Sequence, residues 1–306
     1  MIAGFSCLAL IIVFAIFPPR DFPPNSFIHV DRGKSVTVIG EELKDKNLIR
    51  SVEAFKIFVK ISGGEKRMQV GTYFFKQPTS VINVALKITN RFLGIKPYRV
   101  VITEGMSNEK IANRLVKQIP NFNKEEFLEK TVDLEGRLFP DTYFFSPLDT
   151  VDDVIFEMSQ NWEEQTAELR KEIMLAGKSL DDILIMASII ERETNTAEDR
   201  RLVSGILWKR IEIGMPMQVD ATFEYYTNYN TYTVTKEVLK QDNPYNTYTN
   251  KGLPPTPIAN PGIDSIKAAL TPTASPYLYY LTGRDGIMYY AEDFAGHKKN
   301  RRLYLD

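Results

Sequence analysis

Acid–base chemistry in this sequence has to be carried by carboxylates. The chain has two histidines, His29 and His297, which leave no histidine-rich metal site and little for a triad whose base is histidine. Its one cysteine, Cys7, cannot form an internal disulfide or supply the thiolates of a structural zinc site. A glutamate or aspartate acts alone as a proton donor mainly where burial raises its pKa. The candidate is therefore a carboxylate on an apolar surface.

Glu191 is such a carboxylate. Ser179 can cap a helix that begins with two acidic residues, and residues 183–190 follow with a single polar residue. A helix this apolar must be buried. Steps of three and four residues from Ile183 reach Glu191, whereas the next two residues rotate away from that stripe. The periodicity therefore predicts one carboxylate on the buried side of the helix.

Two interpretations of Glu191 remain open on periodicity alone. A glutamate desolvated at this place could hold a proton near neutrality and act as a general acid toward a glycosidic oxygen. Alternatively, Glu191 pairs with Arg192, Arg200 or Arg201 where the helix emerges into solvent. Most glutamates at helix ends are solvated, so the periodicity by itself favours the ion pair.

The N-terminal leader is apolar. Residues 1–17 carry no charge, a length at the lower edge of what spans a bilayer as a helix, and we predict a transmembrane anchor over residues 1–20. A cleaved signal peptide is the alternative, but a basic stretch before the apolar core and a small-residue cleavage site before Pro18 are both missing. Arg20 and Lys34 follow the segment, and the positive-inside tendency opposes export of the body.

The rest of the composition is that of a folded α+β protein. The chain has 306 residues, 43% hydrophobic and 25% charged, which is enough for two domains. Its net charge of -1 leaves no basic field for binding nucleic acid. The pattern predicts strands at 35–39, 71–75 and 98–103, helices at 41–49, 51–61, 109–118, 151–175, 195–213 and 263–270, a further helical stretch ending at 130, a turn-rich passage at 135–147, and a closing hairpin of 277–281 with 287–291.

Separated motifs identify a family. Residues 187–194 read ASIIERET, and they are accompanied by LEGRLFPDTY at 134–143, GMPMQVD at 214–220, YNTY at 245–248 with GLPP at 252–255, and NPG at 260–262 followed by SIKAA at 265–269. In this order they resemble the signatures of the endolytic murein transglycosylases, the MltG or YceG-like family. The resemblance covers the chain from about residue 97 to its end. Two departures are Ala221, where the family has proline, and Met288 to Tyr290, where it usually has a histidine.

The resemblance implies a function and an organisation. The catalytic residue would be Glu191, which would cut peptidoglycan between MurNAc and GlcNAc within a strand and leave 1,6-anhydro ends, without a metal or cofactor. Residues 21–93 would form a small LysM-like α/β subdomain, and residues 94–306 a mixed α+β catalytic domain. The catalytic domain would lie outside the cytoplasmic membrane, beside cell wall synthesis enzymes such as penicillin-binding proteins.

Five residues in the motifs are candidates for holding sugar hydroxyl and acetamido groups. They offer amide, carboxylate and aromatic surfaces, and they are Gln218, Asp220, Tyr245, Asn246 and Tyr248. The alternative at each position is a role in loop architecture. Glu135 and Asp141 fit a structural role better, with Asp141 capping the two residues that follow.

Two rival functions stay open. A hydrolase would need a second carboxylate across the scissile bond, and Asp220 is the candidate. A membrane-anchored scaffold that binds peptidoglycan without cutting it would not need Glu191. The Glu191→Gln substitution separates scaffold from enzyme, because it keeps the shape of the side chain and removes its proton.

Overall fold

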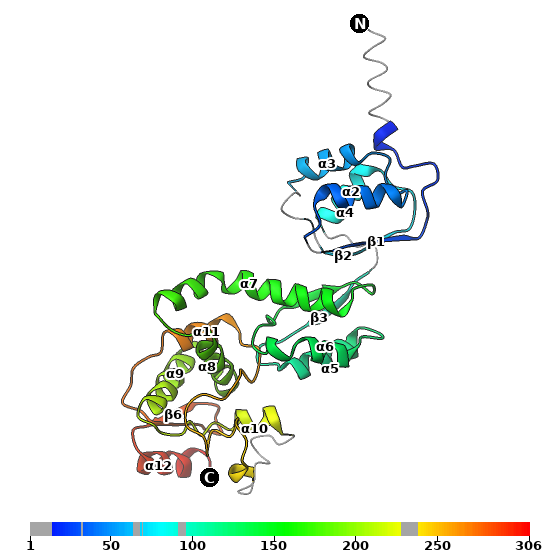
Figure 1. Ribbon diagram of the computed structural model, residues 1–306. Helices are drawn as coiled ribbons and strands as arrows, with labels where there is room; N and C mark the ends of the chain where they lie inside the picture. The colour runs from blue at the N-terminus through cyan, green and yellow to red at the C-terminus, as the bar shows by residue number, and fades with distance from the viewer. Residues whose placement is uncertain (1–13, 32, 64–67, 69, 91–95, 228–237) are drawn as a thin grey trace. The chain divides into compact units, whose positions relative to one another are not determined.

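The computed structural model describes residues 14–31, 33–63, 68, 70–90, 96–227 and 238–306 (Figure 1). It is a mixed α+β structure made of two compact units. The first unit comprises Met1–Val100, Gln118–Pro120 and Tyr143–Val154, and the second comprises Val101–Lys117, Asn121–Thr142 and Ile155–Asp306. The predicted boundary between residues 93 and 94 lies outside the described residues, as does most of the predicted anchor. Within the described part of the chain, no helix has the length and apolar character needed to cross a membrane.

The first unit packs helices on a two-stranded antiparallel sheet. Strand β1 (Ser26–Val30) pairs with β2 (Gly71–Phe75), and Ile28 lies opposite Tyr73 in the register. Alternate residues of both strands are buried, as the period of two in a strand requires. The helices are α2 (Val36–Asp45), α3 (Val52–Ile61) and α4 (Val81–Thr89), and a serine side chain caps the N-terminus of each.

The predicted strand at 35–39 is wrong. Ser35 is the N-cap of α2, and its hydroxyl accepts a hydrogen bond from the Val38 N–H at 3.3 Å. Ile39 and Leu43 then face the core at helical spacing. The strand that opens the unit is β1, and it lies in a stretch whose sequence reads as an extended loop. The cap and the buried face outweigh the β-propensity of the valines.

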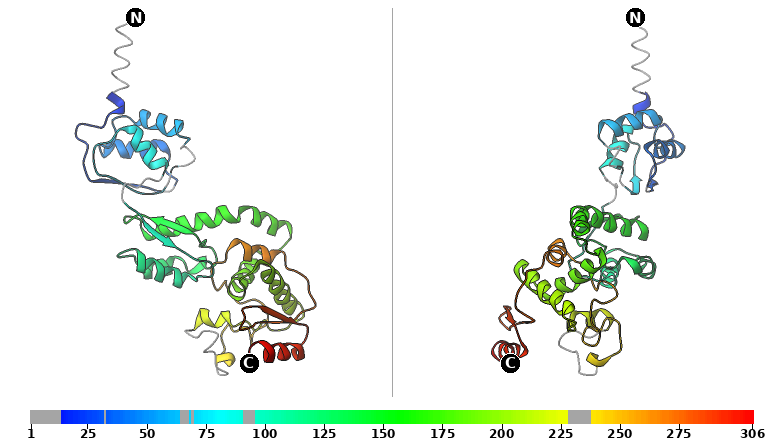
Figure 2. Two further views of the ribbon diagram at one scale, coloured as in Figure 1. Left: turned by 180° about the vertical axis from the view of Figure 1, so that it is seen from behind. Right: turned by 60° about the vertical axis from the view of Figure 1, so that its left-hand side comes forward.

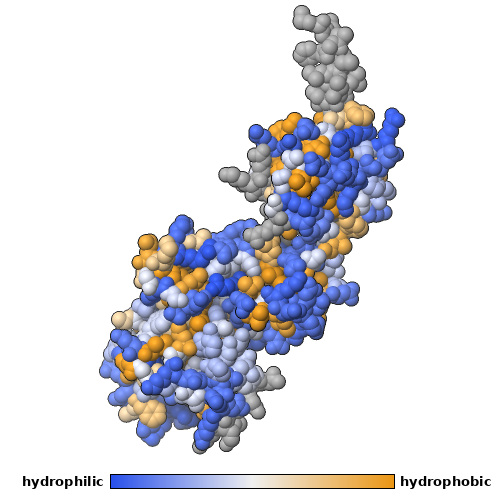
Figure 3. All heavy atoms as spheres, in the orientation of Figure 1, coloured by the Kyte–Doolittle hydropathy of each residue, from blue (hydrophilic) through white to orange (hydrophobic). Residues whose placement is uncertain are grey.

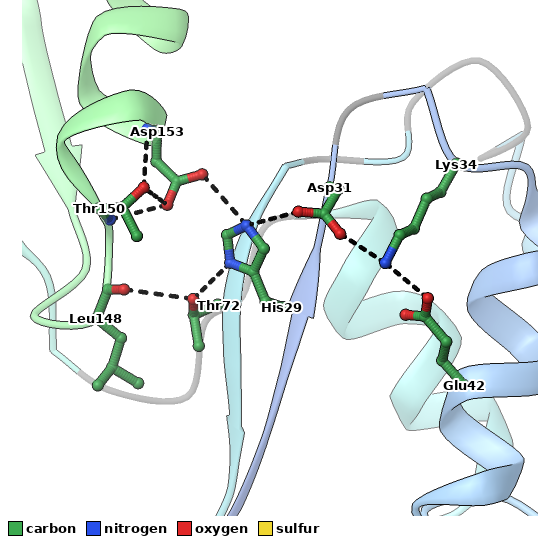
Figure 4. Close-up of polar contacts among 8 residues, drawn as sticks. All are labelled: His29, Asp31, Lys34, Glu42, Thr72, Leu148, Thr150 and Asp153. Carbon is green, nitrogen blue, oxygen red and sulfur yellow. Dashed lines mark hydrogen bonds and ion pairs between the residues drawn. The ribbon is translucent and has the colours of Figure 1, made fainter.

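His29 has a structural place in the first unit (Figure 4). Its Nδ1 lies 2.8 Å from the Thr72 hydroxyl, and its Nε2 lies 3.3 Å from a carboxylate oxygen of Asp31 and 3.6 Å from one of Asp153. Asp153 also accepts hydrogen bonds from the Thr150 N–H and hydroxyl, each at 2.8 Å, at the start of helix α7 (Val151–Leu175). This histidine therefore links the sheet to a helix start and contributes nothing to the motifs.

The second unit is mainly helical, with short strands. Strand β5 (Tyr279–Thr282) pairs antiparallel with β6 (Met288–Ala291). Strands β3 (Tyr98–Val101) and β4 (Thr142–Phe145) form another two-stranded sheet, most of whose residues belong to the first unit. The helices are α5 (Asn108–Gln118), α6 (Lys124–Lys130), α7 (Val151–Leu175), α8 (Leu180–Glu193), α9 (Ala197–Glu212), α10 (Ala221–Tyr226), α11 (Ile263–Leu270) and α12 (Phe294–Tyr304), with 3-10 turns at Val132–Leu134 and Val238–Lys240.

Helix α8 is the centre of this unit. Every residue from Ile183 to Ile190 is buried, and α9 and α11 pack against α8 and against each other (Figure 2). Ser188, the polar residue in this run, donates to the Ile185 carbonyl and accepts from the Ile258 N–H. The predicted burial of the helix is confirmed, and its polar residue is satisfied as burial requires.

Several predicted elements are confirmed and others need correction. The predicted helix at 41–49 is α2, which begins at Val36 and ends at Asp45. Helix α7 has its predicted ends, and Ser179 caps α8 through the Asp182 N–H at 3.4 Å. The turn-rich passage contains β4, and α9 begins at Ala197 because Thr196 is its cap. The hairpin does not close the chain, since α12 follows it and Asn300 donates to the Tyr290 carbonyl.

On the face shown in Figure 3, hydrophilic residues surround scattered apolar areas.

Candidate active site

Glu191 lies in the last turn of α8 with 6% of its side chain exposed. One carboxylate oxygen accepts hydrogen bonds from the Gly262 N–H at 3.0 Å and the Ser265 hydroxyl at 2.8 Å. The other lies 3.3 Å from the Arg200 guanidinium on α9. Three donors from two other segments therefore hold the carboxylate in one orientation.

The start of α11 supplies two of these donors. Gly262 is the N-cap of the helix, where backbone N–H groups have no partner within the helix and favour negative charge. A Cβ at Gly262 would overlap the Glu104 carboxylate, so any larger residue would displace that side chain. The NPG motif thus delivers a backbone donor to Glu191.

A turn at Glu104 and Gly105 borders the site from another side. Gly105 has a φ of +77°, and a Cβ built on it would lie 3.6 Å from Glu191 Cγ. Burial raises the pKa of Glu104, and the charge of Glu191 raises it further. Arg192 donates to the Gly105 carbonyl at 3.3 Å and pairs with Glu224. No sequence pattern indicated Glu104, because its proximity to Glu191 depends on the fold.

Behind this loop lies a buried polar network centred on Glu135. Its carboxylate accepts from the Asn108 N–H at 3.1 Å, from Asn260 Nδ2 at 3.3 Å and from the Tyr225 hydroxyl at 3.5 Å. Burial raises the pKa of Glu135 to about 7 against the lowering effect of the hydrogen bonds from Asn108 and Tyr225. Asn260 Oδ1 also accepts from the Leu138 N–H at 2.8 Å. The network joins two motifs and fixes the chain two residues before Gly262.

The predicted substrate-binding residues fall into separate environments. Tyr248 donates to Asp220 at 2.6 Å, and Gln218 is exposed with a φ of 54°. Asn246 is fully buried, and its amide donates to the Leu239 and Gln241 carbonyls. The Tyr245 hydroxyl forms a hydrogen bond with the Thr256 hydroxyl at 2.8 Å. The amide of Asn246 thus serves loop architecture, while Gln218 is the accessible member of the set.

Sequence reasoning also missed the contact between Glu193 and Tyr280. Glu193 lies two residues beyond Glu191, and helical spacing turns it away from the buried stripe. The hairpin covers it, because the Tyr280 hydroxyl on β5 donates to Glu193 at 3.1 Å. A Tyr-rich strand near the end of the chain was the available signal, but pairing it with Glu193 requires the fold.

The ion-pair interpretation of Glu191 is confirmed in one respect. Arg200 is the partner, whereas Arg192 pairs with Glu224. A solvated glutamate at a helix end would lack the additional donors from Gly262 and Ser265. Among the residues the structure describes, no cluster of three His, Cys, Asp or Glu side chains could hold a metal ion. The site is built around one oriented carboxylate.

Comparison with known proteins places this site in a family. A model of the YceG-like family matches residues 28–303. A protein of Bacillus subtilis (strain 168) named endolytic murein transglycosylase is 30% identical over 94% of this chain and 86% of its own length. One of the same name from Streptococcus pneumoniae serotype 2 is 30% identical over 55% of this chain and 31% of its own length. A crystal structure of a putative YceG-like protein from Listeria monocytogenes matches 90% of this chain and 99% of its own, with a TM-score of 0.61 and 29% identity. The chain belongs to the YceG-like family.

Proposed function

We propose that this protein is an endolytic murein transglycosylase, a lyase that cuts peptidoglycan glycan strands internally between MurNAc and GlcNAc, with Glu191 as its acid and base. The name shared by its relatives supports the activity. The role of Glu191 is supported by one observation: Gly262, Ser265 and Arg200 orient its carboxylate at the end of a buried helix.

The reaction uses one carboxylate twice. Protonated Glu191 donates its proton to the glycosidic oxygen, and the bond from that oxygen to C1 of MurNAc breaks as GlcNAc leaves with the proton. The Glu191 carboxylate then removes the proton of the MurNAc 6-hydroxyl, whose oxygen forms a bond to C1 and closes the 1,6-anhydro ring. The proton count balances, and Glu191 returns to its starting form. Because the substrate supplies the nucleophile, neither water nor a metal enters the step.

The donors around Glu191 have separate tasks in this scheme. The Gly262 N–H and the Ser265 hydroxyl hold one oxygen of the carboxylate, and the other oxygen, which pairs with Arg200, is the one that we propose faces the substrate. Arg200 stabilises the negative charge that Glu191 carries after it has donated its proton. Gln218 and Asp220 precede α10 and are proposed to hold the glycan, because an amide and a carboxylate can hydrogen-bond its hydroxyl and acetamido groups.

The location and partners are part of the same proposal. Residues 1–20 would anchor the chain in the cytoplasmic membrane as a single pass, with the catalytic domain on the outer side. The LysM-like assignment of residues 21–93 is supported by two antiparallel strands that bracket helices α2 and α3. Penicillin-binding proteins are the proposed partners, because strand termination has to act beside strand synthesis.

Product analysis tests the proposal. Purified glycan strands are incubated with the full chain in detergent, and the fragment ends are determined by mass spectrometry. Internal fragments with 1,6-anhydro-MurNAc ends are expected. Reducing ends on the fragments would contradict the lytic step and indicate a hydrolase, with Asp220 as the second carboxylate. Retained glycan binding with no fragments at all would indicate the scaffold.

A further inference from the structure

Glu104 lies beside Glu191 because its segment is tied to the NPG motif. Met106 and Asn260 form an antiparallel bridge, in which the Asn260 N–H donates to the Met106 carbonyl at 2.9 Å. The Gly105 N–H donates to the Asn260 carbonyl, also at 2.9 Å. The backbone that follows Glu104 is therefore held against the motif that supplies a donor to Glu191.

Gly262 gives the Glu104 side chain its place. The Gly262 N–H donates to Glu191 at 3.0 Å, and Glu104 occupies the space that a side chain at position 262 would fill. A Cβ there would lie 1.8 Å from Glu104 Oε1, 2.3 Å from Cδ and 3.0 Å from Cγ, and these are the three atoms nearest to it. The φ of Gly262 is -76°, which other residues also adopt, so its missing side chain is what makes room for Glu104. One glycine thus lies against both carboxylates.

The oxygens of Glu104 are available to a ligand. Glu104 is exposed, and within the described part of the chain its carboxylate accepts no hydrogen bond and forms no ion pair. The buried carboxylate of Glu191, by contrast, has three donors. A carboxylate offers about four acceptor positions. Glu104 is therefore an acceptor held at the edge of the site, ready for hydroxyl and N–H groups of whatever Glu191 acts on.

We propose that Glu104 is a substrate-binding residue of the active site: its carboxylate accepts hydrogen bonds from hydroxyl or amide N–H groups of the MurNAc unit whose bond is cut, and it places that sugar against Glu191. The inference rests on the proposed function, because the glycan is the substrate there. MurNAc offers donors of both kinds in its 6-hydroxyl and its acetamido N–H. Proton transfer stays with Glu191, and Glu104 adds no covalent step.

Two substitutions at Glu104 test the inference, with kcat and KM measured from anhydro-end formation by the full chain in detergent. Glu104→Ala removes both acceptor oxygens, and kcat/KM is expected to fall roughly 10- to 100-fold, the factor for a hydrogen bond to a charged group. Glu104→Gln keeps one acceptor oxygen and is expected to lose less than about tenfold. Thermal denaturation should be unchanged in both variants, because the side chain is exposed and makes no bond within the described chain.

Gly262→Ala provides an independent test. It keeps the N–H that donates to Glu191, and its methyl group displaces the Glu104 side chain. We expect kcat/KM to fall by a factor similar to that of Glu104→Ala. Glu104→Ala added to Gly262→Ala is then expected to cause less than about a twofold further loss, because the two changes remove the same contact. Losses that multiply in the double variant would overturn the inference.

A matched control and the remaining outcomes complete the test. Glu198→Ala removes an exposed glutamate on α9 and is expected to leave kcat/KM unchanged. A normal kcat/KM in Glu104→Ala would overturn the inference while leaving the proposed function intact. Equal losses in Glu104→Gln and Glu104→Ala would also overturn it, since the ionisable group rather than the acceptor would then be required. Absence of anhydro ends from digests by the unsubstituted chain would contradict the proposed function and this inference with it.

Discussion

The interiors of the two units differ in what they bury. The first unit has an apolar core, in which the buried polar side chains among the described residues are those of Thr89, Ser146 and Asp153. The second unit also buries amide and ionisable side chains, among them those of Asn108, Glu135, Arg210, Asn246 and Asn260. Burying a polar group costs free energy unless the group is hydrogen-bonded, so each of these side chains needs a partner in the interior. The difference indicates that apolar packing defines the interior of the first unit, whereas the interior of the second unit also depends on hydrogen bonds between buried polar side chains.

The largest effect is expected at Asn260. Asn260→Leu keeps a similar volume but removes one donor to the buried Glu135 and leaves the Leu138 N–H without its acceptor, so the free energy of unfolding should fall by about 3–5 kcal/mol. Cleavage should also be lost in the molecules that remain folded, because Gly262 is two residues away. Chemical denaturation and cleavage per folded molecule measure the two effects. A stable variant with normal cleavage would remove the network from the account.

A change of similar kind in the first unit is expected to affect stability alone. Leu43 is fully buried in α2, and Leu43→Ala should lower the free energy of unfolding by about 3 kcal/mol through lost burial and the cavity left behind. Cleavage per folded molecule should stay within twofold of the unsubstituted value. A large loss of cleavage in the folded fraction would mean that the first unit takes part in the chemistry.

The pH dependence of stability should also distinguish the units. The pKa of Glu135 is about 7 in the fold and close to 4.5 in the unfolded chain, so the folded state binds more protons between these values. Its contribution is fully present below about pH 4.5 and is lost as pH rises through 7, on the order of 2 kcal/mol between pH 5 and pH 8. Glu135→Gln should remove this share of the slope. The same change in the free energy of unfolding between pH 5 and pH 8 in Glu135→Gln and in the unsubstituted chain would contradict the burial of an ionisable Glu135.

The smallest effect is expected at a helix cap. Ser51 accepts from the Ala54 N–H at 3.1 Å at the start of α3. Ser51→Ala should lower the free energy of unfolding by about 1 kcal/mol, and Ser51→Thr, which can still cap, should restore most of it. Denaturation of the three proteins measures the difference. No loss in Ser51→Ala would show that packing alone fixes this helix.

Local patterns predicted the elements that carry the site. The ends of α7, the Ser179 cap and the burial of α8 follow from spacing and capping within one helix. The valines near Ser35 predicted a strand through their β-propensity. That propensity is weaker evidence than a helix cap and a buried helical face, and the segment is therefore helical. The family motifs predicted Glu191 as the catalytic residue, and periodicity alone favoured the ion pair that it makes with Arg200.

Contacts between distant segments could not be predicted. Gly262 and Ser265 lie 71 and 74 residues from Glu191 along the chain, and Tyr280 lies 87 residues from Glu193. Spacing within a helix says which side of it a carboxylate occupies, but it does not say what covers that side. The assignment of Asn246 to the glycan had the same weakness, since its amide is used by its own loop.

The most direct test of the account compares binding and cleavage of glycan strands by Glu191→Gln and by the unsubstituted chain in the same samples. The substitution keeps an acceptor oxygen for Gly262 and Ser265 while removing the proton that the reaction needs. The account predicts binding within a few-fold and a rate of anhydro-end formation about a thousandfold lower. Cleavage by the variant at a rate near that of the unsubstituted chain would contradict the assignment of Glu191 as the acid and base.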